Sequence, residues 1–326
     1  MESQIIEMNG IYQFILPTPF PVGPVNVYLI KGDSLTLVDT GPKSKVAWGL
    51  FCELLDKVGY KPEDIDQVVL THHHPDHVGM LEYMPKDIKI IGHYKNNPWI
   101  HKEELFIQRH ELFFIEFFKN MGIEEQLCWP LIDDMKGAFE YSCNNRFITT
   151  VVKEGDEIPG IHGWNVYETP GHAGSHIILF HEHNALMIAG DLLIENTSPN
   201  PFIEPPYPGE TERSKSLPLY LDSLSKCLQF DMRLVLSGHG KAIKDPYMLI
   251  HSQFNKQEER AQRIYEWLKE KPMSAFELNE KLYPSLRYRN QLGLTIFATV
   301  GQLDVLEQKQ AVYIEKTEDV WKFFVR

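Results

Sequence analysis

The sequence predicts an α/β protein made of stacked layers, with a separate helical module after it. Three features of the sequence pattern lead to this prediction. Short apolar runs bounded by turn residues alternate with a helical segment over the first 70 residues, an aromatic helical stretch then interrupts the strands, and charged helices follow residue 253. A chain of 326 residues is long enough to form one large domain or two.

The first strands and the first helix are bounded by turn and capping residues. Residues 11–39 contain three apolar runs separated by a proline-rich gap and a glycine turn, which is typical of strands. A helix is expected over residues 44–58, because Gly59 follows as a helix-ending residue. Residues 66–70 form a short apolar run, which predicts a strand that leads into a histidine-rich loop at Thr71.

Inserted helices are predicted at about residues 98–140. The stretch 98–126 is rich in Phe and Trp, and Asn97 and Pro98 suit the start of a helix. The strand pattern then returns in several short runs. The expected elements are strands at residues 147–152, 164–169, 177–180 and 185–189, a proline-rich loop at 196–209, a helix at 217–228 and a last strand at 233–236.

The pattern changes again from Gln253 onward. Helices are expected at residues 256–269, 274–282 and 288–307. The alternating end of the chain predicts a hairpin with its turn near residues 317–319. Three helices and a hairpin is the order of a winged-helix module, so we expect a larger domain of residues 1–250 and a winged-helix-like domain of residues 251–326.

The formal net charge is −13, and the acidic excess lies in one part of the chain. Residues 253–326 carry 12 Lys and Arg against 11 Asp and Glu, so residues 1–252 carry a net charge of −14. An acidic surface repels phosphate backbones, which disfavours nucleic acid as a partner. The basic residues Lys281, Arg287 and Arg289 are too few for tight binding.

Three further features predict a cytoplasmic protein without a membrane anchor. The four cysteines are widely spaced and form no C-x-x-C pair, so neither a zinc–thiolate site nor a disulfide scaffold is expected. The first ten residues lack the basic and apolar regions of a signal peptide. No run of about 18 apolar residues is present, which argues against a membrane span.

The motif T-H-H-H-P-D-H-V-G at residues 71–79 carries the chemistry. His72 and His74 stand two positions apart on an extended loop, so both imidazoles can face one metal ion. Asp76 and His77 follow directly and can face a second metal ion beside it. His73 lies between two of these residues and is expected to point away.

Three more candidate ligands stand at the ends of predicted strands. His172 lies in T-P-G-H-A-G-S, where the flanking glycines allow the backbone to approach closely. Asp191 ends the run A-G-D, and a carboxylate there can bridge two cations. His239 lies in L-S-G-H-G. Each is weak evidence alone, and their order along the chain gives them weight.

Taken in order, these residues resemble the ligand set of the metallo-β-lactamase superfamily, and the resemblance covers about residues 5–245. It implies an αβ/βα four-layer sandwich with a dinuclear metal site at one edge of the two sheets. By position, the implied ligands are His72, His74 and His172 for the first metal, Asp76, His77 and His239 for the second, and Asp191 between them. Asp39, in V-D-T-G, matches a family position that supports the ligand loop.

The resemblance also implies the cofactor and the reaction. Two divalent metal ions are expected, zinc first, with iron or manganese able to use the same nitrogen and oxygen ligands. Such a pair lowers the pKa of a bound water toward neutrality, which supplies a nucleophile without a catalytic Ser or Cys. Asp76 would carry the proton to the leaving group.

Two departures from known branches narrow the activity. Zinc β-lactamases generally have a cysteine where Asp191 stands, so β-lactam hydrolysis is not expected. Flavin-linked di-iron oxidoreductases of this fold have an acidic residue where His74 stands, which favours hydrolysis over oxygen chemistry here. Persulfide dioxygenases share much of the histidine pattern and stay open as a possibility.

The substrate class is left between two hypotheses. The Phe-rich insertion, interpreted as an apolar cap over the site, favours a small-molecule ester, thioester or lactone. The C-terminal module resembles the extension of a branch that includes a mitochondrial endoribonuclease, which keeps a ribonuclease or phosphodiesterase as the alternative. The same aromatic residues fit packing in a core or in a homodimer equally well. A non-catalytic binding module is a third class, which the intact ligand set disfavours.

Overall fold

The protein is described from a computed structural model, which covers residues 5–8, 10–285, 291–317 and 320–326. Arg287, Arg289 and most of the predicted turn at residues 317–319 lie outside the described residues. Among the described residues, no helix has the length and apolar character needed to cross a lipid bilayer.

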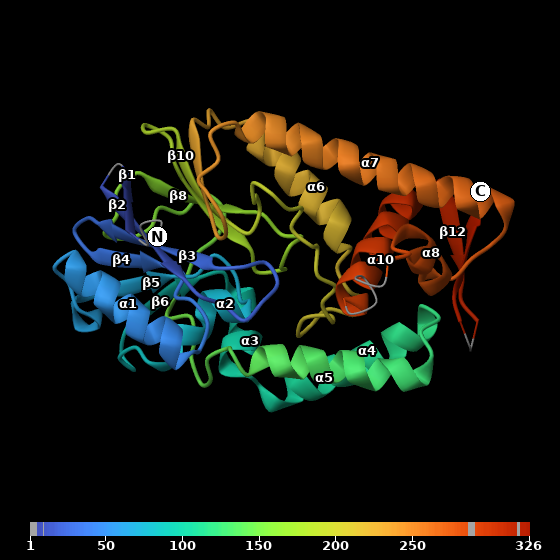
Figure 1. Ribbon diagram of the computed structural model, residues 1–326, viewed down its shortest axis with the longest axis horizontal. Helices are drawn as coiled ribbons and strands as arrows, with labels where there is room; N and C mark the ends of the chain where they lie inside the picture. The colour runs from blue at the N-terminus through green and yellow to red at the C-terminus, as the bar shows by residue number, and fades with distance from the viewer. Residues whose placement is uncertain (1–4, 9, 286–290, 318–319) are drawn as a thin grey trace.

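Two β-sheets lie side by side in the part of the molecule that contains the N-terminal strands, at the left of Figure 1. The first contains, in spatial order, β1 (Ile5–Met8), β2 (Ile11–Leu16), β3 (Val25–Lys31), β4 (Leu35–Val38), β5 (Gln67–Val69), β6 (Lys89–Gly92) and β7 (Thr150–Val151). The second contains β11 (Leu234–Ser237), β10 (Leu186–Gly190), β9 (Ile177–His181) and β8 (Trp164–Glu168). Strands β1 to β4 pair antiparallel and β4 to β7 pair parallel, while in the second sheet only β10 and β11 run parallel.

Helices cover the outer faces of these sheets and form most of the C-terminal part of the chain. The α-helices of the described residues are α1 (Lys45–Lys57), α2 (Pro75–Val78), α3 (Asn97–His101), α4 (Glu104–Asn120), α5 (Glu125–Phe139), α6 (Ser216–Cys227), α7 (Pro246–Glu270), α8 (Ala275–Leu282) and α10 (Leu292–Gln308). Short 3₁₀ turns lie at Pro62–Asp64, Gly79–Glu82 and Tyr94–Asn96. A hairpin of β12 (Val312–Glu315) and β13 (Lys322–Val325) closes the chain.

Three apolar clusters hold the layers together. Between the sheets, side chains such as Val38 of the first sheet pack with Leu179 of the second. On the far side of the first sheet, Phe51 of α1 packs against it, and on the far side of the second sheet Tyr220 of α6 and Ile250 of α7 do the same. The expected αβ/βα four-layer sandwich is therefore confirmed.

Local signals placed most helices correctly. The Ser44 side chain accepts a hydrogen bond from the Ala47 amide and caps the start of α1. Gly59, just after the end of the helix, adopts a left-handed conformation with a φ of +87°. Ser274 and Glu277 form a capping box at the start of α8.

Three strand predictions differ from the structure. Strand β1 lies at the edge of the first sheet and β6 lies inside it, and neither was predicted. The strand expected at residues 147–152 contains only Thr150 and Val151, because Ile148 and Thr149 bond to Asn97 and Ile90 in an irregular geometry. Short strands with few residues leave little periodicity to detect.

The inserted helices and the C-terminal helices share one hydrophobic core. Phe114, Phe117 and Phe118 of α4 pack around Phe297 of α10, and all four side chains are buried. Figure 1 shows α4 and α5 lying beside this C-terminal group, away from the N-terminal strands. Helix α7 runs from the sandwich into this group without a break. The element order expected for the module is present, while its winged-helix character and the division at residue 250 stay predictions.

Candidate metal centre

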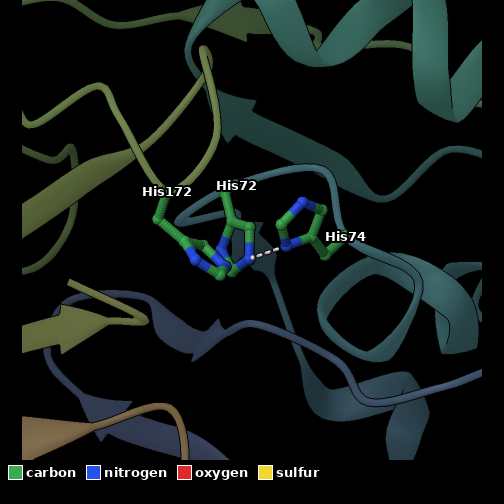
Figure 2. Close-up of side chains that lie close together, drawn as sticks. All are labelled: His72, His74 and His172. Atoms are coloured by element: carbon green, nitrogen blue, oxygen red, sulfur yellow. Dashed lines mark hydrogen bonds between the residues drawn. The ribbon is translucent and has the colours of Figure 1, made fainter. Parts of the chain in front are cut away.

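The histidine-rich loop begins where β5 ends. Pro75 starts the short helix α2 at a position where its missing amide hydrogen is not needed, and the extended residues before it carry His72 and His74. Their ring nitrogens, His72 Nε2 and His74 Nδ1, lie 3.0 Å apart. Figure 2 shows His172 approaching the same point from a different loop. The three imidazoles offer nitrogen atoms within 4.8 Å of one another.

Two glycines allow the backbone to pass close to its neighbours around the site, one beside His172 and one beside His239. Gly171 has a φ of +136°, and a Cβ there would lie 2.3 Å from the Tyr220 amide nitrogen of α6. Gly238, beside His239, passes so close to Asp191 that a Cβ would lie 2.2 Å from Asp191 Oδ1. Backbone therefore approaches the site more closely than any side chain would allow.

A second group forms beside the first. Asp76, His77 and His239 also offer atoms within 4.8 Å of one another. Asp191 lies between the two groups: its Oδ1 is 3.5 Å from His77 Nε2, and its Oδ2 is 3.5 Å from both His172 Nε2 and His239 Nε2. Asp76 Oδ2 is 3.3 Å from His239 Nε2. The structure thus brings together all seven side chains that the sequence singled out.

Hydrogen bonds on the outer side fix the direction of three imidazoles. The Nδ1 atoms of His77, His172 and His239 lie 2.8 Å from Asp39 Oδ2, the Asn200 carbonyl and the Pro24 carbonyl respectively. Since these partners are acceptors, each Nδ1 donates its proton outward, and in the neutral imidazole that binds a metal ion each Nε2 presents its lone pair inward.

Asp39 acts at the base of the ligand loop. It has a left-handed backbone conformation (φ 59°), which Asp adopts more readily than most residues. Its carboxylate accepts hydrogen bonds from the Thr71 amide and hydroxyl as well as from His77. The supporting role expected for Asp39 agrees with these contacts.

Four inward-facing atoms have no hydrogen-bond partner among the described residues, although each is buried: His77 Nε2, His172 Nε2, His239 Nε2 and Asp191 Oδ1. Leaving a buried polar atom without a partner costs about 1–3 kcal/mol. Four such atoms gathered at the Asp191 carboxylate fit a site for cations, because a cation satisfies lone pairs that have no hydrogen-bond donor.

Burial and the neighbouring carboxylates set the charges of the site. Burial lowers the pKa of His72, His74 and His172, which favours the neutral imidazole that binds metals. Burial also opposes protonation of His77 and His239, but the neighbouring carboxylates together outweigh it. Asp191 and Asp76 raise the pKa of both histidines, Asp39 adds to the effect at His77, and the pKa of His239 rises to about 10.

The sequence did not reveal a second polar cluster behind the ligand loop. His73 belongs to neither group of ligands, as expected, although its ring centre lies 5.1 Å from that of His74. Its ring stacks on Trp99 with ring centres 4.3 Å apart. Its Nε2 lies 3.6 Å from the buried carboxylate of Glu204, which accepts a hydrogen bond from the Tyr207 hydroxyl. Burial raises the pKa of Glu204 to about 7. Glu204 lies in the proline-rich loop, where its only sequence signal is one acidic residue between Ile203 and Pro205.

Comparison with known proteins agrees with this geometry. Residues 20–239 match the sequence model of the metallo-beta-lactamase superfamily. The chain belongs to this superfamily. A probable metallo-hydrolase of Bacillus subtilis, YqjP, is 43% identical over 299 residues, which cover 91% of this chain and 92% of that protein.

Solved metallo-beta-lactamase structures share the fold over nearly the whole chain. A family protein from Thermus thermophilus has a TM-score of 0.81 at 23% identity and covers 98% of this chain and 99% of its own. A beta-lactamase domain protein from Burkholderia ambifaria has a TM-score of 0.80 at 21% identity, and the match covers 99% of this chain and 94% of that protein. The likeness includes the C-terminal helices. The protein is therefore a metallo-hydrolase of the metallo-beta-lactamase superfamily, with His and Asp groups that could bind metal ions.

Proposed function

We propose that the protein is a dinuclear metal-dependent hydrolase of esters, thioesters or lactones. His72, His74 and His172 would hold one divalent cation, and Asp76, His77 and His239 would hold a second, with Asp191 between them. The observation that carries this proposal is that buried, unpartnered ligand atoms gather around Asp191 in two adjoining groups. Imidazole and carboxylate ligands suit zinc, which we expect, and also iron or manganese.

The side chains of the centre have different roles in the proposed reaction. Two divalent cations bound by such a set supply Lewis acidity and make water a nucleophile near neutral pH. Asp191 faces both groups and keeps them together. Asp76 has one oxygen 3.3 Å from His239 Nε2 and the other 4.0 Å from His77 Nε2, so the second is only loosely engaged. We assign Asp76 the role of receiving the proton and passing it to the leaving group.

An aromatic side chain beside the first group supports an apolar substrate. The Phe202 ring centre lies 4.7 Å from that of His74 and 5.5 Å from that of His172, and Phe202 is only half-buried. Phe297 of α10 packs behind it at 6.2 Å. An acyl chain or lactone ring would contact this surface favourably. The net charge of −14 over residues 1–252 disfavours a phosphate-rich substrate.

Two measurements test the proposal. Elemental analysis of protein purified without chelators should give two metal ions per chain. Protein reconstituted with zinc should hydrolyse members of a panel of thioesters, esters and lactones, while phosphodiesters and short RNA serve as the comparison arm. Turnover of RNA or phosphodiesters alone would replace the proposed substrate class with the ribonuclease alternative. Substoichiometric metal with no gain on reconstitution would refute the dinuclear centre.

A further inference from the structure

Glu204 lies at a junction of the two loops that carry the first group of ligands. The residue is buried, with 7% of its surface exposed. Oε1 accepts a hydrogen bond of 2.9 Å from the Gly174 amide, two residues after His172, and lies 3.6 Å from Nε2 of His73, which stands between His72 and His74. One carboxylate therefore contacts both loops.

The surroundings of Glu204 leave it little freedom. Its Oε2 accepts a hydrogen bond of 2.7 Å from the Tyr207 hydroxyl, which in turn accepts one of 3.0 Å from the Trp99 indole. Trp99 stacks on the His73 ring with 6° between the planes, which closes a ring of contacts. A Cβ at Gly174 would lie 2.6 Å from Glu204 Oε2, so the carboxylate fits only against bare backbone.

The two loops also contact each other and the segment that carries Glu204. Ser175 Oγ lies 2.8 Å from His73 Nδ1, and the Asn200 carbonyl accepts from His172 Nδ1. The second group of ligands is held elsewhere: His77 by Asp39 and His239 by Pro24. The contacts of Glu204 thus lie next to ligands of the first group, and none of those described is with Asp76, His77 or His239.

We infer that Glu204 is a positioning residue, which fixes the loop of His72 and His74 relative to the loop of His172 and so sets the affinity of the first metal ion. The inference rests on the proposed dinuclear centre. Residues that orient metal ligands typically change metal affinity by about 10- to 100-fold when they are replaced. The asymmetry between the two groups distinguishes this role from a general effect on the fold, which would weaken both metal ions alike.

The test is stepwise zinc binding to metal-stripped full-length protein, measured by competition with a chromophoric chelator. Glu204→Ala should weaken one of the two zinc-binding steps by about 10- to 100-fold and leave the other unchanged. Glu204→Gln keeps the shape and the acceptor for Gly174 but cannot accept from Tyr207 through its amide nitrogen, so it should restore part of that affinity. Tyr207→Phe removes the same hydroxyl contact from the other side and should match Glu204→Gln.

Glu212→Gln is the matched control, because Glu212 is an exposed carboxylate on the same segment. It should bind zinc as the wild type does. If the wild type binds two zinc ions, either of two results would overturn the inference. One is an equal loss of zinc affinity at both steps in Glu204→Ala, and the other is an unchanged zinc affinity in Glu204→Gln and Tyr207→Phe. Wild-type protein that bound no zinc would overturn the proposed centre and the inference together.

Discussion

Replacing Asp39 by Asn tests how the ligand loop is supported, because Asp39 accepts three hydrogen bonds with two oxygens. Oδ1 accepts from the Thr71 amide at 2.8 Å, and Oδ2 accepts from the Thr71 hydroxyl at 2.7 Å and from His77 Nδ1 at 2.8 Å. An asparagine offers one oxygen and one NH₂ group in the same place. In either orientation, the NH₂ group of the asparagine faces a hydrogen-bond donor, which is either His77 Nδ1 or the Thr71 amide.

The two orientations have different consequences. If the NH₂ group takes the place of Oδ2, His77 Nδ1 must become an acceptor, its proton moves to Nε2, and the atom that faces Asp191 can no longer bind a metal ion. If it takes the place of Oδ1, the buried Thr71 amide loses its acceptor. Each lost partner costs about 1–3 kcal/mol, which is roughly 5- to 150-fold in a zinc-binding constant in the first case. In the second case the same energy is lost from the free energy of unfolding.

The assay therefore combines zinc competition with denaturant unfolding of metal-stripped protein. In Asp39→Asn, the loss in the free energy of zinc binding and the loss in the free energy of unfolding should together reach at least about 1 kcal/mol. Asp231→Asn, at an exposed position, serves as the control and should change neither quantity. An Asp39→Asn protein that binds zinc and unfolds as the wild type does would refute the assignment of Asp39 as the support of this loop.

Four further outcomes are expected. Asp191→Ala should abolish turnover and leave the far-ultraviolet circular dichroism unchanged; near-normal activity on every substrate class would contradict its bridging place. The raised pKa values of His77 and His239 favour protonation of both imidazoles near pH 7 in the metal-free protein, so zinc must displace protons and its affinity should rise with pH. Calorimetry in two buffers with different ionisation enthalpies should detect this proton release. The absence of proton release would count against the site. Phe297→Ala should lower the free energy of unfolding by about 3–5 kcal/mol, and a loss below about 1 kcal/mol would show that the shared core is poorly packed. Fluorescence anisotropy across a salt series should show no submicromolar RNA or DNA binding, and salt-sensitive binding that is lost in an Arg287→Ala/Arg289→Ala double variant would reverse the assignment of residues 253–326 to packing.

Much of the site could be predicted because its residues lie where strands end. His72, His172, Asp191 and His239 follow β5, β8, β10 and β11 within a few residues. A strand is recognisable from a short apolar run, and the polar residue after it is then fixed in place by the sheet. The order of these residues along the chain could therefore be compared directly with the superfamily.

The contacts of Glu204 could not be predicted in the same way. Its partner His73 lies far away in the sequence, as does Trp99, which contacts both His73 and Tyr207. The loop around Glu204 has no periodicity that indicates burial. The aromatic side chains of the insertion were recognised, but not their partner. Phe114 and Phe118 lie against Phe297, a contact that depends on how two distant segments meet.

The common core of α4, α5 and the C-terminal helices makes each of these two segments depend on the other for the burial of its apolar side chains. Fully burying a phenylalanine contributes about 1.5–3 kcal/mol, and Phe114 and Phe118 on one side meet Phe297 on the other with almost no exposure. A chain with only the insertion would expose an apolar surface to water, and so would a chain with only the C-terminal extension. We therefore expect homologues of this sandwich to carry both segments or neither.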